Sequence, residues 1–583
     1  MCGTKMAVLA GFSFMALKAA AESGYSPVPE RCQSLATATQ ARACAAEPAA
    51  DVSHAAHAAH AAHGTAASHG SHSPFAGRLP GAWPDPRLGV IVAQRVRGML
   101  QYFPNEIKMD RAHTVMLAER GIIGDAEAAA ILGVLGRVEA RGIDPATIDG
   151  SKSTVFWYVE AALIDELGID LGGKMHTGRS HNDILPTLSR MTARDRLLVL
   201  FERVLALRRV LRAQAAAHVD TVMPGYTTLQ HGQPWTFGHY LLGWDHAFAR
   251  DFERLQGAYR HTNRSSLGAS ALAGSSWPLD RERTAALLGF DGIVRHARDA
   301  GFGTKDYVAE ILAAIGIAMS NLSTLCGDLY LWSSYEFGMV KIADGFCGTS
   351  SIMPQKKNAW ALDWTRGAAG NAAGYFGSCL AALRGTSSTD AMAQEYPDWP
   401  LAEACTEACD YLDMVTGVLE SIKANAALMA ERASANWTTA SNLADAIVRH
   451  GGFSFRSAHG IVGRLVREAG LAGLALSEVD TAFLDRVATQ VAQRPAGLSE
   501  AQLRAALDPQ GFVNTRVTAG SVHPDEVRAM LDEAQATAAQ DAAWFEAARE
   551  RVTNAAAALD AEVARRLGSN PESNPGSNPE PAA

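Results

Sequence analysis

The chain has 583 residues, of which 48% are hydrophobic and 19% are charged, and its formal net charge at pH 7 is −9. Its composition is ordinary for a globular protein, and its length favours two or three domains or one large multi-layer body. The net negative charge, with acidic and basic residues mixed along the chain, argues against nucleic acid as the main partner. Beyond the N-terminus no uninterrupted apolar run reaches 18 residues, so the body is not expected to span a membrane.

Residues 1–75 differ from the rest of the chain. The apolar stretch MAVLAGFSFMAL follows Lys5 and resembles the core of a signal peptide over residues 1–22. A later tract places His54, His57, His60 and His63 at a period of three, a spacing that can hold a soft divalent metal. The alternative is a disordered leader, or a start codon placed too far upstream. Residues 567–583 repeat Ser-Asn-Pro and predict a disordered tail.

Between these ends the main signal is helical periodicity. Apolar residues recur at spacings of three and four in 195–211 and 309–332, and they form a heptad seam in 401–422. Since no segment alternates convincingly with the period of two that strands show, we predict an all-α fold of long bundled helices. Four cysteines in or beside these helices are expected to be reduced, buried thiols: Cys326, Cys347, Cys405 and Cys409.

Runs of Gly, Pro and polar residues divide the helical part. We predict a leader, an N-terminal helical domain, a central long-helix bundle, a C-terminal helical domain and a tail, bounded as 1–75, 76–183, 184–430, 431–566 and 567–583. Long helices with apolar stripes bury them against several partners, so an oligomer that shares one bundle is plausible.

Three polar segments lie in these breaks. The first is HTGRSHND (176–183), the second is GYTTLQHGQP (225–234) and the third is CGTSSIMPQKKNAW (347–360). Each is rich in hydrogen-bond donors and poor in carboxylates, a composition that suits the binding of small dicarboxylates where helices end. A polar helix cap explains each segment alone about as well, above all the first with Ser180 and Asn182. Three such segments in one chain favour a site.

The three segments together resemble the fumarase/aspartase superfamily, and within it the argininosuccinate lyases, over residues 76–566. SSIMPQKKN (350–358) resembles the signature loop, with the Gln-Lys-Lys-Asn ending of argininosuccinate lyases. The first segment is similar to His-Thr-Gly-Arg-Ser-Arg-Asn-Asp, and the second to Gly-Tyr-Thr-His-Leu-Gln-x-x-Gln-Pro. The resemblance implies a three-domain fold with a long central bundle, and a homotetramer whose active sites are each built by three subunits. It also implies anti elimination across a C–N bond with release of fumarate, no cofactor and no metal.

The resemblance also assigns roles to single residues. Removal of a proton beside a carboxylate leaves a doubly charged aci-carboxylate, which a site must stabilise with donors or fixed positive charge. Ser350 is the candidate base, and Lys356 either stabilises its alkoxide or neutralises charge on the substrate. Asn358 is expected to hold a carboxylate and to cap a helix that starts at Ala359, while residues 348–351 act as a lid. The predicted substrate contacts are Thr177, Ser180, His181, Asn182, Thr227 and, on the amine half, Gln394.

The chain departs from the family where the amine half is recognised. Thr228 replaces a histidine associated with proton transfer to the leaving amine, so His231, a water or another group donates that proton, or the amine needs less help. His181 replaces an arginine, Ala359 a proline, Asp390 a tyrosine, and Asp398 stands close to the expected lysine.

Three functional alternatives follow from these departures. One is argininosuccinate cleavage to arginine and fumarate. Another is cleavage of a different N-substituted aspartate, for example an aminopolycarboxylate such as ethylenediamine-disuccinate. The last is an inactive paralogue kept as a structural protein, like the lens crystallins of this family, although retention of Ser350, Lys356 and Asn358 argues against it. Family members work in the cytoplasm, which is the expected location unless residues 1–22 export the protein.

Overall fold

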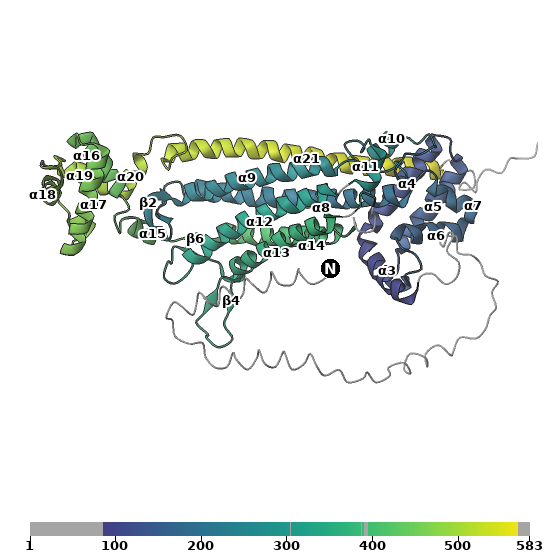
Figure 1. Cartoon of the computed structure of the whole chain (residues 1–583), viewed down its shortest axis with the longest axis horizontal. Helices are drawn as coiled ribbons and strands as arrows, with labels where there is room; N and C mark the ends of the chain where they lie inside the picture. The colour runs from purple at the N-terminus through teal and green to yellow at the C-terminus, as the bar shows by residue number, and fades with distance from the viewer. Residues whose placement is uncertain (1–84, 304, 386, 390–394, 569–583) are drawn as a thin grey trace, which may run out of the picture. The chain divides into compact units, whose positions relative to one another are not determined.

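The computed structural model describes residues 85–303, 305–385, 387–389 and 395–568. The predicted leader with its histidine tract, the chain beyond residue 568, and the positions Asp390 and Gln394 lie outside these ranges. All described residues belong to one structural unit. Their arrangement is shown in Figure 1.

A first group of helices surrounds an apolar core ahead of the first polar segment. These helices are α3 (Pro86–Met99), α4 (Phe103–Glu119), α5 (Asp125–Arg141), α6 (Val155–Leu167) and α7 (Ile169–Gly172). A 3₁₀ turn, Gly173–His176, leads from α7 into the polar segment. The short helices α10 (Arg281–Leu287) and α11 (Ala297–Phe302) lie near this end of the bundle in Figure 1.

Long helices form the central bundle and enclose the largest apolar core. They are α8 (His181–Ala217), α9 (Phe237–Thr262), α12 (Asp306–Trp332), α13 (Trp360–Leu383), α14 (Asp398–Ser421) and α21 (Pro524–Gly568). The three periodic stretches coincide with α8, α12 and α14, the last running one residue past the end of α14, which confirms these helices. By length and composition alone α12 is apolar enough to cross a membrane, but its apolar side chains are largely buried in this core.

Within the described residues, three small two-stranded antiparallel sheets interrupt the helices. Strands β1 (Val222–Thr227) and β2 (Gln230–Thr236) form a hairpin, β3 (Val340–Lys341) pairs with β6 (Lys423–Ala424), and β4 (Gly348–Thr349) pairs with β5 (Lys357–Asn358). The prediction of an all-α chain is therefore right about the mostly helical fold but wrong about these sheets. Two-residue strands are too short to show alternation, and the hairpin carries Pro and Gly, which strands disfavour.

Six helices of the described chain follow before it returns to the bundle. They are α15 (Ala426–Ala433), α16 (Ala440–Gly451), α17 (Phe455–Ala472), α18 (Thr481–Ala492), α19 (Glu500–Leu507) and α20 (Pro509–Asn514). The middle four of them, α16–α19, enclose a separate apolar core. Helix α21 then runs back along α8 and α9 and reaches α4 and α5, where Leu559 and Val563 join the core of the first helices.

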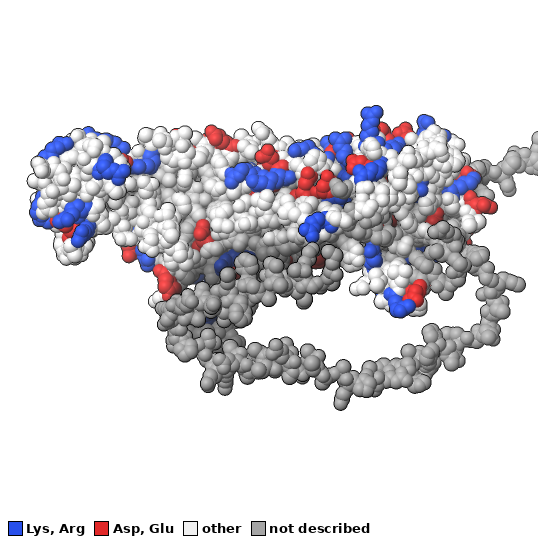
Figure 2. All heavy atoms as spheres, in the orientation of Figure 1, with Lys and Arg blue, Asp and Glu red and all other residues white. Residues whose placement is uncertain are grey.

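Charges of both signs are mixed over the face of the bundle shown in Figure 2, whereas Lys and Arg prevail over α16–α19. The cysteines predicted to be reduced are free thiols. Cys326 and Cys405 are buried as expected, but Cys347 and Cys409 are only partly buried. The domain boundaries at 183 and 430 stay predictions.

Candidate active site

The first polar segment ends in the N-cap of α8. Ser180 Oγ accepts a hydrogen bond from the Asn182 backbone N–H at 3.4 Å, and the Ser180 N–H donates to Asp183 Oδ1 at 2.8 Å, which makes a capping box. Thr177 Oγ donates to the Lys174 carbonyl at 2.7 Å. The side chains of Thr177 and Ser180 therefore hold the backbone that presents Asn182, whose carboxamide forms no hydrogen bond within the described chain.

His181 is a neutral, enclosed imidazole. Its Nε2 accepts a hydrogen bond from Trp157 Nε1, and its ring centroid lies 5.8 Å from that of Phe156. Burial, with a smaller contribution from the nearby His176, lowers the pKa of His181 to about 4. At neutral pH the side chain therefore does not supply the positive charge that an arginine at this position would supply.

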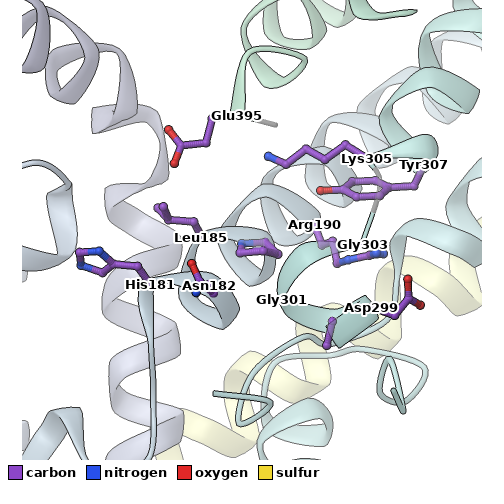
Figure 3. Close-up of a pocket in the computed structure, with 12 residues that line it drawn as sticks. His181, Asn182, Leu185, Arg190, Asp299, Gly301, Gly303, Lys305, Tyr307 and Glu395 are labelled. Carbon is purple, nitrogen blue, oxygen red and sulfur yellow. The ribbon is translucent and has the colours of Figure 1, made fainter. Parts of the chain in front are cut away.

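His181 and Asn182 line a cavity together with residues from three other parts of the chain (Figure 3). The charged and hydroxyl-bearing lining residues are Arg190 from α8, Asp299 from α11, Lys305 and Tyr307 at the start of α12, and Glu395 ahead of α14. The cavity thus joins one polar segment to residues that the sequence motifs did not indicate.

Two ion pairs neutralise most of the buried charge in this cavity. Lys305 Nζ pairs with Asp398, which also accepts hydrogen bonds from Tyr102 Oη at 3.1 Å and Ser189 Oγ at 2.9 Å. Burial opposes the charge of Lys305, but the charge and hydrogen bond of Asp398, together with Tyr307 and Glu395, outweigh burial and raise the pKa of Lys305. Glu395 pairs with Arg95.

The second polar segment is the β1–β2 hairpin. Thr228 and Leu229 form its two-residue turn with φ of 53° and 59°, and Thr227 and Thr228 are exposed. His231 lies on β2, where its Nε2 is 3.4 Å from Tyr226 Oη and its Nδ1 is buried without a hydrogen bond. The hairpin therefore offers the imidazole of His231 and the phenol of Tyr226 near exposed threonine hydroxyl groups.

The third polar segment is an arm whose base is the β4–β5 pair. Ser350 Oγ accepts hydrogen bonds from the backbone N–H groups of Met353 at 3.1 Å and Ile352 at 3.4 Å. Two donors aimed at one oxygen stabilise negative charge on it, as in an oxyanion hole. The arrangement suits a serine that must act as an alkoxide.

The two lysines of this arm differ in their contacts. Lys357 Nζ donates to the Ile342 carbonyl at 2.7 Å and pairs with Asp344, so it fixes the base of the arm. Lys356 is exposed and has no ion-pair partner among the described residues. Lys356 is therefore the lysine that is free to meet a substrate.

Asn358 does not cap the following helix, so this prediction is wrong. Helix α13 begins at Trp360 with Ala359 as its N-cap residue, and no side chain caps it. Because Asn358 is paired in β5, its side chain crosses the small sheet and donates to the Gly348 carbonyl at 3.5 Å. Gly348 is required there, since a Cβ atom would lie 2.0 Å from the Trp360 ring.

The three polar segments do not meet within one chain. Helix α8 has 37 residues and separates the first segment from the hairpin, a length of about 55 Å at the usual rise. Helix α12, with 27 residues, separates Lys305 from the arm by about 40 Å. Figure 1 shows β2 and α11 at opposite ends of the bundle, and β4 on the arm beside it.

Sequence reasoning missed Arg190 and Lys305, although one signal for Arg190 was available. The apolar pattern of α8 begins immediately after the first polar segment, and an arginine eight residues beyond Asn182 falls on a nearby face of the helix. The nearness of Lys305 to Asp398 depends on helix packing, which no local pattern reports.

Comparison of the chain with known proteins identifies its family. Residues 92–374 match the lyase family model, and residues 437–514 match the model of the argininosuccinate lyase C-terminal region. Argininosuccinate lyase 1 from Shouchella clausii is 36% identical over 75% of this chain and 87% of its own length. The argininosuccinate lyase of Methanocaldococcus jannaschii is 37% identical over 73% of this chain and 87% of its own length.

A solved relative has the same fold. The crystal structure of an EDDS lyase in complex with formate superposes with a TM-score of 0.74 at 35% identity, covering 82% of this chain and 95% of that protein. An EDDS lyase variant with bound fumarate superposes equally well. This chain belongs to the fumarase/aspartase superfamily of lyases and is argininosuccinate lyase-like within it.

Proposed function

We propose that this protein is a carbon–nitrogen lyase that eliminates an amine from an N-substituted aspartate and releases fumarate. The observation that supports this most is the pair of backbone N–H groups, from Ile352 and Met353, directed at Ser350 Oγ. Ser350 as an alkoxide takes the proton from the carbon beside the carboxylate. Lys356 and Asn358 then neutralise and hold the charge that develops, and the C–N bond breaks to give fumarate and the amine.

Argininosuccinate is the first substrate to consider, because the curated relatives are argininosuccinate lyases. A second candidate is an aminopolycarboxylate, by analogy with the EDDS lyase. Two observations favour a binding site for the amine half that differs from that of argininosuccinate lyases. His181 carries no charge near neutral pH, and Asp398, close to the position of an expected lysine, is already paired with Lys305.

The separation of the three polar segments supports an oligomeric site. Ser350 of one copy, Thr227 and Thr228 of a second, and Asn182 of a third would meet in a homotetramer, as the resemblance implies. His231 is then the histidine nearest to Thr228 in sequence and is the proposed proton donor to the leaving amine. A cytoplasmic location is part of the same proposal.

The test is release of fumarate, followed by its ultraviolet absorbance, from purified full-length protein with argininosuccinate and a panel of other N-substituted aspartates. Release from at least one substrate, lost in Ser350→Ala, supports the proposal. An intact oligomer that releases fumarate from none of them contradicts it and favours the inactive, crystallin-like alternative.

A further inference from the structure

Arg190 is a buried guanidinium group without a carboxylate partner. Its side chain is 8% exposed, and its Nη1 donates to the carbonyls of His261 at 2.7 Å and Thr262 at 3.4 Å. The guanidinium carbon lies 4.1 Å from the centre of the Tyr307 ring. No described carboxylate forms an ion pair with Arg190, and its Nε is buried without a hydrogen bond.

The other charged residues that line the same cavity do not compensate Arg190. Lys305 and Glu395 are paired elsewhere, and Asp299 is exposed to solvent. The two carbonyls at the end of α9 contribute about half a charge through the helix dipole. A buried cation is costly unless an anion meets it, and neither Nε nor Nη2 of Arg190 forms a hydrogen bond with a described residue.

A second cleft continues outward from Arg190. Arg190, Asp299 and Tyr307 line both spaces, and the outer cleft adds Arg260, Arg264 and Arg295. Arg260 and Arg295 have no ion-pair partner among the described residues, whereas His261 is paired with Glu310 at 2.7 Å. Asp306 and Glu310 also line the outer cleft, so with Asp299 it has three carboxylates against four arginines. The small excess of positive charge favours an anion at the entrance.

We infer that Arg190 binds a carboxylate on the amine half of the substrate. Arg190 lies eight residues beyond Asn182 on α8, about 12 Å along the helix axis. A substrate whose aspartate part contacts Asn182 reaches Arg190 only when its amine half ends in a carboxylate on a chain of several atoms. This inference rests on the proposed function and narrows its substrate class to N-substituted aspartates made from ω-amino acids or longer amino acids.

The test compares substrates that differ in one terminal group. The substrates are N-(ω-carboxyalkyl)aspartates whose amine half lengthens from glycine to 6-aminohexanoate, and each is compared with the carboxamide of the same length. The kcat and KM for fumarate release are measured for both. Wild-type protein is expected to favour the carboxylate by about 10- to 100-fold in kcat/KM, mostly through KM and most strongly for the longer chains. In Arg190→Met this ratio is expected to fall close to one.

Arg194 provides a matched control. It lies one turn further along α8, is buried, donates to the Leu288 carbonyl at 2.8 Å and stacks on Phe290 at 5.1 Å, but it pairs with Asp195 and lines neither space. Arg194→Met is expected to keep the carboxylate preference. Thermal unfolding shows whether Arg190→Met is folded. If it is not, Arg190→Lys is the test, because a single ammonium group cannot reproduce the planar pair of N–H groups. The ratio of kcat/KM for carboxylate over carboxamide must then fall in Arg190→Lys.

The outcomes separate the two proposals. Equal kcat/KM for carboxylate and carboxamide in wild-type protein, or an unchanged ratio in both Arg190 variants, overturns the inference and leaves the lyase activity in place. Absence of fumarate from every member of the series and from argininosuccinate overturns the proposed function, and the inference with it.

Discussion

Asp398 and Lys305 form a buried ion pair at the edge of the cavity, with the Asp398 side chain 7% exposed and Lys305 6% exposed. The pair joins the start of α12 to the first residue of α14. Removing one partner leaves a buried charge unpaired. We expect Lys305→Met to lower the free energy of unfolding by about 3–5 kcal/mol in urea titrations.

The double variant Lys305→Met with Asp398→Asn removes both charges and is expected to recover part of that loss. If it is as unstable as the single variant, lost packing rather than the unpaired carboxylate explains the effect.

Ser350→Ala is expected to lower kcat for fumarate release by about 10²- to 10⁴-fold, because the proposed base is removed while the backbone donors stay in place. Steady-state kinetics on whichever N-substituted aspartate proves active will measure this. Ser351 is exposed and forms no side-chain hydrogen bond in the described structure, so Ser351→Ala is the control. Equal losses in both variants would remove Ser350 from its assigned role.

The two lysines of the arm are expected to behave differently. Lys356→Met should lower kcat because its ammonium group is free to meet substrate. Lys357→Met should instead loosen the base of the arm, since Lys357 binds the Ile342 carbonyl and Asp344, and we expect faster proteolysis between residues 344 and 358. If Lys357→Met lowers kcat and Lys356→Met does not, Lys357 rather than Lys356 contacts the substrate.

His181 makes stability depend on pH. Its pKa is about 4 in the folded protein and about 6.5 when unfolded, so between these values the unfolded chain binds the extra proton. The contribution of His181 to the free energy of unfolding is therefore complete above pH 6.5 and decreases as the pH drops toward 4. Burial raises the pKa of Asp183 to about 6, which gives a slope of the opposite sign between pH 3.8 and 6.

The comparison of wild-type protein with His181→Gln isolates the histidine contribution. In urea unfolding from pH 7.5 down to 4, the free energy of unfolding should decrease less in the variant than in wild-type protein, by up to about 3 kcal/mol over this range. Identical pH profiles would mean that the imidazole is solvated and charged in the folded protein.

Mixed oligomers test whether copies share sites. Ser350→Ala and Asn182→Ala are each expected to be inactive alone, but subunits refolded together should regain part of the activity, because some sites then receive both intact residues from different chains. Mixtures of Ser350→Ala with Lys356→Met, which change the same arm, are the control and should stay inactive. Recovery in neither mixture would favour sites built within one chain.

Much of the fold and part of the site follow from the sequence alone. Periodicity predicts α8, α12 and α14 because each helix buries one continuous face, and the cap at Ser180 follows from local hydrogen bonding. The role of Asn358 as a cap was wrong because a two-residue strand holds it one position too early. Arg190 and the Lys305–Asp398 pair stayed hidden because they depend on how helices pack, and Gln394 lies outside the described residues.

Helix α21 has a consequence for how the protein is made. The core around α4 and α5 is completed by Leu559 and Val563, which leave the ribosome more than 400 residues after that core begins at Ala93. Throughout synthesis the early helices therefore expose an apolar surface that only the end of the chain covers. Nascent chains of this protein are expected to depend on chaperones, and early termination before α21 should yield aggregates rather than a shorter folded enzyme.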